Sequence, residues 1–337
     1  MLSRVAESIY WMARYVERAE NLARFIDVTL NVMLDQPGDD PGQWMPLVSA
    51  TGDEAWFKER YGEATQENVI RFLTFDREYA NSIIMVLSAA RENARSIRET
   101  ISSEMWEQLN ESYHRVREAA FGDRPLESPP EFFQEVKRSS HLFNGVMNAT
   151  MARDEGWHFA NMGRLIERAD KTSRILDVKY FILLPGVEDV GTAIDDLQWS
   201  AVLRSVSGFE CYRKRYHGIT PHRIVEFLVL DRSFPRAVQY CIGHADESLH
   251  EITGTPHGSF RNHAEQRLGL LRGELSYIHV DQIVAGGLHE FVDRLQTKLN
   301  GVHDAIDETF FAIRPVSGSQ KQTQTQSAGV QWQSAGG

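Results

Sequence analysis

Cysteine, clustered basic residues and long apolar runs are all scarce in this sequence. Two cysteines, Cys211 and Cys241, occur among 337 residues, which excludes a disulfide framework and favours a reducing, cytoplasmic location. The formal net charge is −11 and no basic cluster offsets it, so we expect no nucleic-acid surface. The most apolar run, near residues 82–90, is too short to span a bilayer. Arg4 and Glu7 interrupt any apolar stretch that a secretory signal would need.

Catalytic signatures are equally scarce. The sequence contains no G-x-S-x-G elbow, no Walker loop, no G-x-G-x-x-G after a strand and no Cys–His arrangement with supporting spacing. Strand-like alternation bounded by Gly and Asn is also hard to find. These absences favour a non-catalytic protein without a cofactor.

Helical periodicity, in contrast, dominates the chain. Apolar residues from Leu2 to Met33 recur with alternating gaps of three and four, which predicts one long amphipathic helix. Prolines and glycines at 37–42 should end it. The same pattern predicts an all-α fold with further helices at 66–74, 77–99, 102–120, 130–150, 154–184, 192–206, 220–229, 234–253, 257–273 and 287–312.

Three polar residues are candidate helix N-caps. Asp76 and Asp231 each follow an apolar run and precede Arg, a pattern typical of a helix start. Ser128 precedes Pro129, and proline is favoured at the first helical position. We therefore expect Asp76, Asp231 and Ser128 to mark the starts of the helices predicted at 77–99, 234–253 and 130–150, respectively.

The chain also contains an internal repeat. YVERAENLARFIDV at 15–28 returns as LIERADKTSRILDV at 165–178, an offset of 150 residues. FLTFDREYANSI at 72–83 matches FLVLDRSFPRAV at 227–238, an offset of 155 residues. The change of offset falls near the Pro/Gly segment, and such loops tolerate insertions. The repeat therefore indicates duplication of a whole helical unit rather than a single recurring motif.

We predict one domain, residues 1–314, built from two related helical units at 1–125 and 150–313. Two such units usually pack about a pseudo-twofold axis, because each buries an apolar stripe that neither can bury alone. The fold predicted is therefore a pseudo-twofold helical bundle. The segment 315–337 is rich in Ser, Gln and Gly, so we expect a disordered polar tail.

Helix 3–34 and helix 154–184, the expected seam between the units, carry the same charged residues. These are Arg14, Glu17, Arg18 and Arg24 in the first helix and Arg164, Glu167, Arg168 and Arg174 in the second. Several stand three or four residues apart, within ion-pair reach along a helix: Arg14 and Glu17, Glu20 and Arg24, Arg164 and Glu167, and Asp170 and Arg174.

Three interpretations of the repeated charges remain open. They could form a solvated face of weak pairs. They could form a partly buried Arg–Glu network that fixes how the two units dock, which is the interpretation we favour. They could also line a pocket in which the arginines hold a carboxylate or phosphate with Glu17 and Glu167 as partners.

A metal site is a further alternative. Helical Glu-x-x-His is the ligand motif of di-iron carboxylate bundles, and it occurs at Glu111/His114, Glu155/His158 and Glu247/His250. A site in a duplicated bundle should use equivalent positions, but at the 155-residue offset His250 faces Arg95. We therefore assign no metal ligand from the sequence.

Three stretches resemble the bacterial Alpha-E family, long known as a domain of unknown function. They are ARYVERAENLARFID at 13–27, SAARENARSIRETISSEMWEQLN at 88–110 and GVMNATMARDEGWHFANMGRLIERAD at 145–170. The resemblance extends to about residue 313. It implies a helical protein without an established reaction, whose genes typically stand beside those of circularly permuted ATP-grasp proteins and transglutaminase-like proteases.

The resemblance implies a role in ATP-dependent peptide or amide-bond formation. Our leading hypothesis is a non-catalytic helical accessory protein that binds an ATP-grasp-type ligase, with a transglutaminase-like protein as a further candidate partner. One alternative is an enzyme whose paired Glu-Arg motifs form an acid/base or anion-binding site. The other is a metal-binding helical bundle. The sequence does not indicate the oligomeric state.

Overall fold

The computed structural model describes residues 1–34, 44–122, 124–182 and 193–312, and these residues form helices and loops without a strand. The all-α prediction is therefore confirmed. The predicted tail at 315–337 lies outside the described residues, as does the Pro/Gly segment at 37–42. None of the described helices is long and apolar enough to cross a membrane.

The described residues of the first half of the chain form eight helices. In order, they are α1 (Ser3–Leu34), α2 (Met45–Ser49), α3 (Glu54–Tyr61), α4 (Gln66–Phe75), α5 (Ile83–Ser96), α6 (Ser103–Ala119), α7 (Arg124–Glu127) and α8 (Pro129–Thr150). The second half continues with α9 (Glu155–Ile182), α10 (Ala193–Ser205), α11 (Phe209–Arg215), α12 (Pro221–Val225), the π-helix η3 (Glu226–Leu230), α13 (Val238–Thr253), α14 (His263–Tyr277), α15 (Val280–Ala285), α16 (Leu288–Ile306) and the π-helix η4 (Asp307–Phe311).

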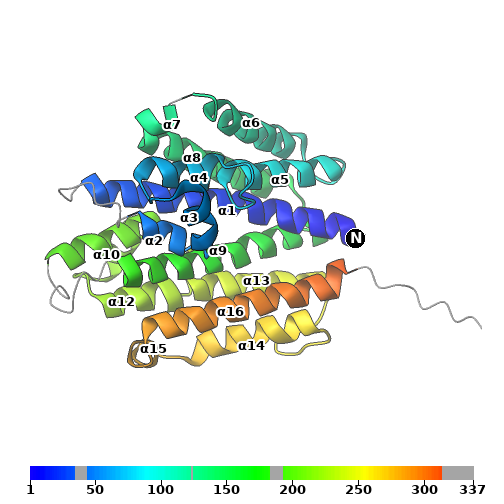
Figure 1. Cartoon of the computed structure of the whole chain (residues 1–337). Coiled ribbons are helices and arrows are strands. Elements are labelled where there is room, and N and C mark those ends of the chain that lie inside the picture. The colour runs from blue at the N-terminus through cyan, green and yellow to red at the C-terminus, as the bar shows by residue number, and fades with distance from the viewer. Residues whose placement is uncertain (35–43, 123, 183–192, 313–337) are drawn as a thin grey trace, which may run out of the picture.

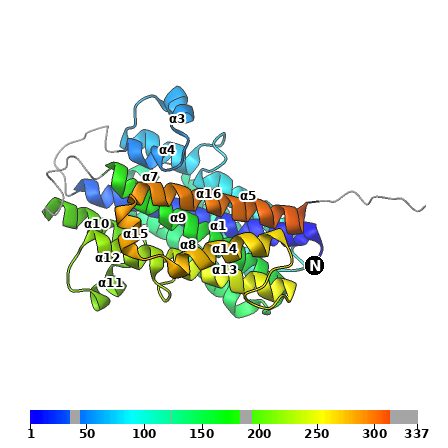
Figure 2. The same ribbon diagram turned by 90° about the horizontal axis from the view of Figure 1, so that it is seen from below.

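Two long helices, α1 and α9, run side by side through the middle of the molecule (Figure 1). Helices α5, α6 and α8 complete a four-helix arrangement with α1, and α13, α14 and α16 complete another with α9. Seen from below, α3 and α4 lie on one side of the central pair and α11 and α12 on the other (Figure 2). The predicted packing of the first long helix against helix 154–184 is confirmed, whereas the pseudo-twofold axis stays a prediction.

Helix α1 is buried on nearly all sides because α5, α8, α9, α10 and η4 surround it. Its predicted apolar stripe lies in the core from Ile9 to Leu30, although Leu2 at its start is exposed. Tyr10 and Ala13, outside that stripe, are also buried. Charged side chains on this helix must therefore find partners inside the protein, because a buried unpaired charge is very costly.

Close approach of the two central helices depends on Gly163. A Cβ atom added at this glycine would lie 2.5 Å from the carbonyl oxygen of Tyr10, closer than any real contact of that kind. The equivalent position in the first copy of the repeat is Ala13, which is buried. Gly163 therefore allows the backbones of α1 and α9 to meet at this level.

Asp76 and Asp231 do not cap the following helices, so those two predictions are wrong. Each follows the preceding helix, and its Oδ1 atom accepts hydrogen bonds from backbone amides two and three residues later. Such Asx turns compete with helix initiation for the same carboxylate. The next helices begin later, after Ser82 and Ala237. Helix α8 does follow Ser128, with proline at its start.

Helix boundaries were missed elsewhere for related reasons. The predicted helix 257–273 begins only at His263, because the Asn262 side chain caps that helix by accepting from the amide of Glu265. The short helices α2, α3, α11 and α15 have no counterpart among the predictions. Their few residues carry too little periodicity to reveal a helix from sequence alone.

Candidate functional site

The two repeated Glu-Arg pairs meet at the contact between α1 and α9, where they exchange partners. Glu17 accepts two hydrogen bonds from Arg168, at 2.8 Å from Nε and 2.7 Å from Nη2. Glu167 accepts two from Arg18, at 2.7 Å from Nε and 3.1 Å from Nη2. Each glutamate therefore binds, in bidentate geometry, the arginine that follows the other glutamate in the sequence.

The exchange extends one turn further along both helices. Arg24 donates from Nε to Glu20 at 2.9 Å, as predicted, and from Nη1 to the carbonyl oxygen of Ser205 at 2.9 Å. Arg174 likewise donates to Asp170 at 3.0 Å, as predicted, and to the carbonyl oxygen of Ala50 at 3.1 Å. Ala50 and Ser205 are separated by the 155-residue offset of the repeat. Each arginine thus reaches from its own helix into the other unit.

Both glutamates are completely buried, with 0% of their surface exposed. Burial alone would raise the pKa of Glu17, but the charges of Arg168 and Arg236 lower it below the usual value despite the nearby Glu20. Burial is likewise overcome at Glu167, where Arg18 lowers the pKa well below the usual range. Both carboxylates are therefore ionised and saturated with donors near neutral pH. This arrangement lends no support to an acid/base role.

The interpretation of these charges as a solvated face is wrong. Arg14, Glu17, Glu167 and Arg168 are all buried. Arg14 also does not pair with Glu17 along its own helix, but donates across the helix contact to Glu167 at 2.9 Å. The favoured interpretation, a buried network at the seam, agrees with these contacts.

Arg236 is a member of this network that sequence reasoning missed. It donates to Glu17 at 3.2 Å and forms an ion pair with Glu20. Its burial lowers its pKa to about 10, although Glu20 partly offsets that effect. The search for charged residues that recur in both copies could not find Arg236, because the equivalent residue in the first copy is the uncharged Asn81. Asn81 itself accepts from Arg18 at 2.8 Å.

A cavity of about 200 Å³ borders the Glu167 end of the network. We call it the cationic cavity, because its lining includes Arg14, Arg18, Lys171 and Arg174 but only one carboxylate, Asp170. Two contacts tie these groups together: Lys171 lies 2.8 Å and Arg174 3.0 Å from Asp170 Oδ2.

The cationic cavity carries an excess of positive charge. Even when the buried Glu167 is counted with Asp170, four cations face two carboxylates. Oδ1 of Asp170 is buried and has no hydrogen-bond partner among the described residues. The excess of cations, not this acceptor, is what favours an anionic group in the cavity.

Arg164 is the one predicted network residue that lies apart. It lines a second cavity, of about 540 Å³, together with Trp157, His158, His244 and His257, and we call this the histidine cavity. Its Nη2 atom donates to Asn161 at 2.6 Å, and its Nε atom has no partner among the described residues. Burial and the nearby Arg168 lower the pKa of Arg164.

These features define a class: an all-helical protein organised around a buried exchange of glutamate–arginine pairs between two long helices. Residues 1–311 match the Alpha-E family, described as a predicted alpha-helical domain with a conserved ER motif. The chain therefore belongs to the Alpha-E family. The ER dipeptides Glu17-Arg18 and Glu167-Arg168 fit that description.

Curated relatives include uncharacterised proteins of Mycobacterium bovis and Mycobacterium tuberculosis. Each is 23% identical to this chain in a match that covers 92% of this chain. The chain spans only 37% of those relatives, so they contain other regions that it does not match. No solved structure matches this chain.

Proposed function

We propose that this chain is a non-catalytic helical binding protein that holds a carboxylate-bearing peptide and supports an ATP-grasp-type ligase in amide-bond formation. The observation that carries the first half is the cationic cavity, where four cations face two carboxylates. The second half rests on the resemblance to the Alpha-E family, whose genes typically stand beside those of ATP-grasp proteins.

Carboxylate recognition suits both the cavity and the proposed pathway. An amide bond is formed from a carboxylate and an amine, so an accessory protein could deliver the carboxylate partner. Guanidinium groups bind carboxylates in a planar, bidentate manner, and Lys adds a compact charge. A volume of about 200 Å³ is below that of a typical ligand pocket, about 300–1,000 Å³. The cavity therefore suits the charged end of a peptide, with the rest of the peptide outside.

Binding of the carboxylate is tested by calorimetric titration of the full chain with N-acetylalanine and with its C-terminal amide. We expect the acid to bind and the amide not to bind. Lys171→Asn introduces the residue that the first copy has at the equivalent position, Asn21. It should weaken acid binding at least tenfold, because a hydrogen bond to a charged group contributes about 1.5–3 kcal/mol. Equal binding of acid and amide would overturn the carboxylate assignment.

The partnership is tested separately by co-expression with a circularly permuted ATP-grasp protein of the kind typically encoded beside Alpha-E genes. We expect the two proteins to elute together in size-exclusion chromatography at micromolar concentration. Added peptide acid should then give an ATP-dependent mass increase that matches amide formation. If no complex forms and no mass change occurs, the accessory role is refuted while the carboxylate site can still stand.

A further inference from the structure

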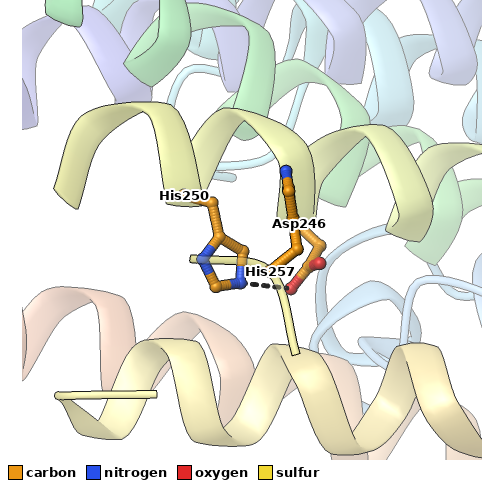
Figure 3. Close-up of side chains that lie close together, drawn as sticks. All are labelled: Asp246, His250 and His257. Atoms are coloured by element: carbon orange, nitrogen blue, oxygen red, sulfur yellow. Dashed lines mark ion pairs between the residues drawn. The ribbon is translucent and has the colours of Figure 1, made fainter. Parts of the chain in front are cut away.

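Three potential metal ligands converge at the end of α13, outside the Glu-Arg network. Asp246 and His250 stand one helical turn apart, and His257 follows in the loop after the helix (Figure 3). That loop turns back at Gly254, where a positive φ of 67° ends the helix. One ligand atom from each of the three residues lies within 4.8 Å of the other two. The chain therefore brings two imidazoles and one carboxylate together.

The orientation of His250 favours a metal ligand. Its Nδ1 atom lies 2.8 Å from the carbonyl oxygen of Thr255, an acceptor only, so Nδ1 carries the proton and donates. In the neutral ring, Nε2 then presents its lone pair to Asp246. A hydrogen bond from one imidazole nitrogen to a carbonyl is the usual way in which proteins orient a metal-binding histidine.

Asp246 presents a free oxygen to the same point. The side chain is 2% exposed, and its Oδ2 atom forms an ion pair with Arg272. Oδ1 accepts no hydrogen bond from the residues that the structure describes. A buried carboxylate oxygen without a partner is unusual and calls for an unseen water, ion or proton.

The separation of these two atoms points to an ion rather than a hydrogen bond. His250 Nε2 lies 3.7 Å from Asp246 Oδ1, which is beyond hydrogen-bonding distance. Two ligands bound to one zinc ion at about 2.0–2.1 Å in tetrahedral geometry stand about 3.3 Å apart. The observed distance therefore needs only a few tenths of an ångström of adjustment to hold one ion between both atoms.

We propose that Asp246, His250 and His257 bind one divalent transition-metal ion, with Zn²⁺ as the best match. Two imidazole nitrogens and one carboxylate oxygen are a common zinc ligand set, and the same set is known in non-haem iron sites. Arg272 holds the second oxygen of the carboxylate, in the manner of an outer-shell partner. The sequence pattern Glu247-x-x-His250 shares His250 with this cluster, but Glu247 pairs with His244 at 2.6 Å.

Three protein ligands leave a coordination position open. His257 also lines the histidine cavity, so the ion borders that space. The same cavity is lined by Arg164 and Trp157, whose Nε and Nε1 atoms are buried donors without partners among the described residues. The open metal position itself suits a small oxygen-bearing ligand, such as water or a carboxylate.

The test is zinc binding by the full chain after treatment with a chelator. We expect calorimetry and elemental analysis to give one Zn²⁺ per chain, with a rise in the thermal midpoint on binding. His257→Ala removes an exposed ligand and should weaken binding at least tenfold without loss of helical circular dichroism. Asp246→Asn keeps the shape of the buried side chain and should weaken binding to a similar extent.

His222→Ala is the matched control, because His222 is an exposed histidine 2.8 Å from a carboxylate, Asp281. We expect this variant to bind one Zn²⁺ as tightly as the unaltered chain. The proposal is overturned if the folded chain binds no stoichiometric Zn²⁺. It is also overturned if His257→Ala and Asp246→Asn, both folded, bind zinc like the control.

Discussion

The two ends of the Glu-Arg network keep the same central pairing but surround it differently. At one end, Glu17 also accepts from Asn21 and Arg236. At the other, Glu167 has Lys171 at 3.5 Å, and the amide, Asn81, binds the arginine instead. Each end thus has one cation and one amide that exchange places between the two repeat positions. The Glu167 end also has Arg14, whose counterpart Arg164 donates to Asn161 instead.

The cation that changes position has different surroundings at the two ends, so we call the Glu17 end closed and the Glu167 end open. Arg236 is buried between Glu17 and Glu20, and it fills that end of the network. Lys171 instead borders the cationic cavity. The bidentate exchange is therefore the docking contact common to both ends, and the cavity is a feature of the Glu167 end. Of the cations that line the cavity, Arg14, Arg18 and Arg174 recur at the other end and only Lys171 differs, so Lys171 is the residue that distinguishes the proposed carboxylate site.

Removal of each glutamate charge should have the largest effect and should distinguish the two ends. Glu17→Gln leaves the buried Arg168 without a counter-charge, which costs about 3–5 kcal/mol of unfolding free energy. Glu167→Gln should cost less, because its cations border a cavity that anions can enter. We expect added sulfate to restore stability to Glu167→Gln but not to Glu17→Gln in urea unfolding. Equal rescue of both variants would contradict the distinction between a closed and an open end.

Acidification should weaken the same contact. Since Glu17 and Glu167 have lowered pKa values in the folded protein, they stabilise it fully above their ordinary value of about 4.5. This contribution is lost as the pH falls through the lower folded values. We expect the unfolding free energy to be nearly constant from pH 7 to about 5 and to fall below that. The two Gln variants should each show a shallower fall, and an identical slope in all three proteins would rule out this origin.

Local patterns predicted more of the fold than of the site. Helical periodicity located the long helices, and the spacing of Glu20 and Arg24 correctly predicted their ion pair, because both depend on the geometry of one helix. The partner of Arg14 depends on how α1 rotates against α9, which no spacing within one helix reveals. Spacing within one helix also gave no indication of Arg236, because this residue approaches the network from a loop that is distant in the sequence.

The candidate metal ligands show a similar limit. The Glu-x-x-His search assumed that ligands stand three residues apart, whereas Asp246 and His250 stand four apart on the same helix. His257 joins them only because the chain reverses after Gly254. A cluster that includes a loop residue cannot be recognised from helical spacing alone.

Gly163→Ala should test how much the close packing of the two central helices contributes to the stability of the protein. The new Cβ would collide with the Tyr10 carbonyl at 2.5 Å, and such overpacking costs about 1–3 kcal/mol. Higher helix propensity returns up to about 1 kcal/mol, so urea unfolding should show a net loss. Gly145→Ala on α8 has open space around the new Cβ and should be neutral or stabilising. A stabilised Gly163→Ala would contradict the tight contact.

Arg236→Asn should have a smaller effect than Glu17→Gln and makes the Glu17 end resemble the other. The variant introduces the residue found at the equivalent position 81. Glu17 keeps its bidentate bond to Arg168 and Glu20 keeps Arg24, so neither carboxylate loses all of its counter-charge. The lost hydrogen bonds are partly offset, because a cation whose pKa is lowered to about 10 is itself poorly solvated. We expect urea unfolding to show a loss of about 1–2 kcal/mol, and a loss as large as that of Glu17→Gln would make Arg236 an equal partner in the docking contact.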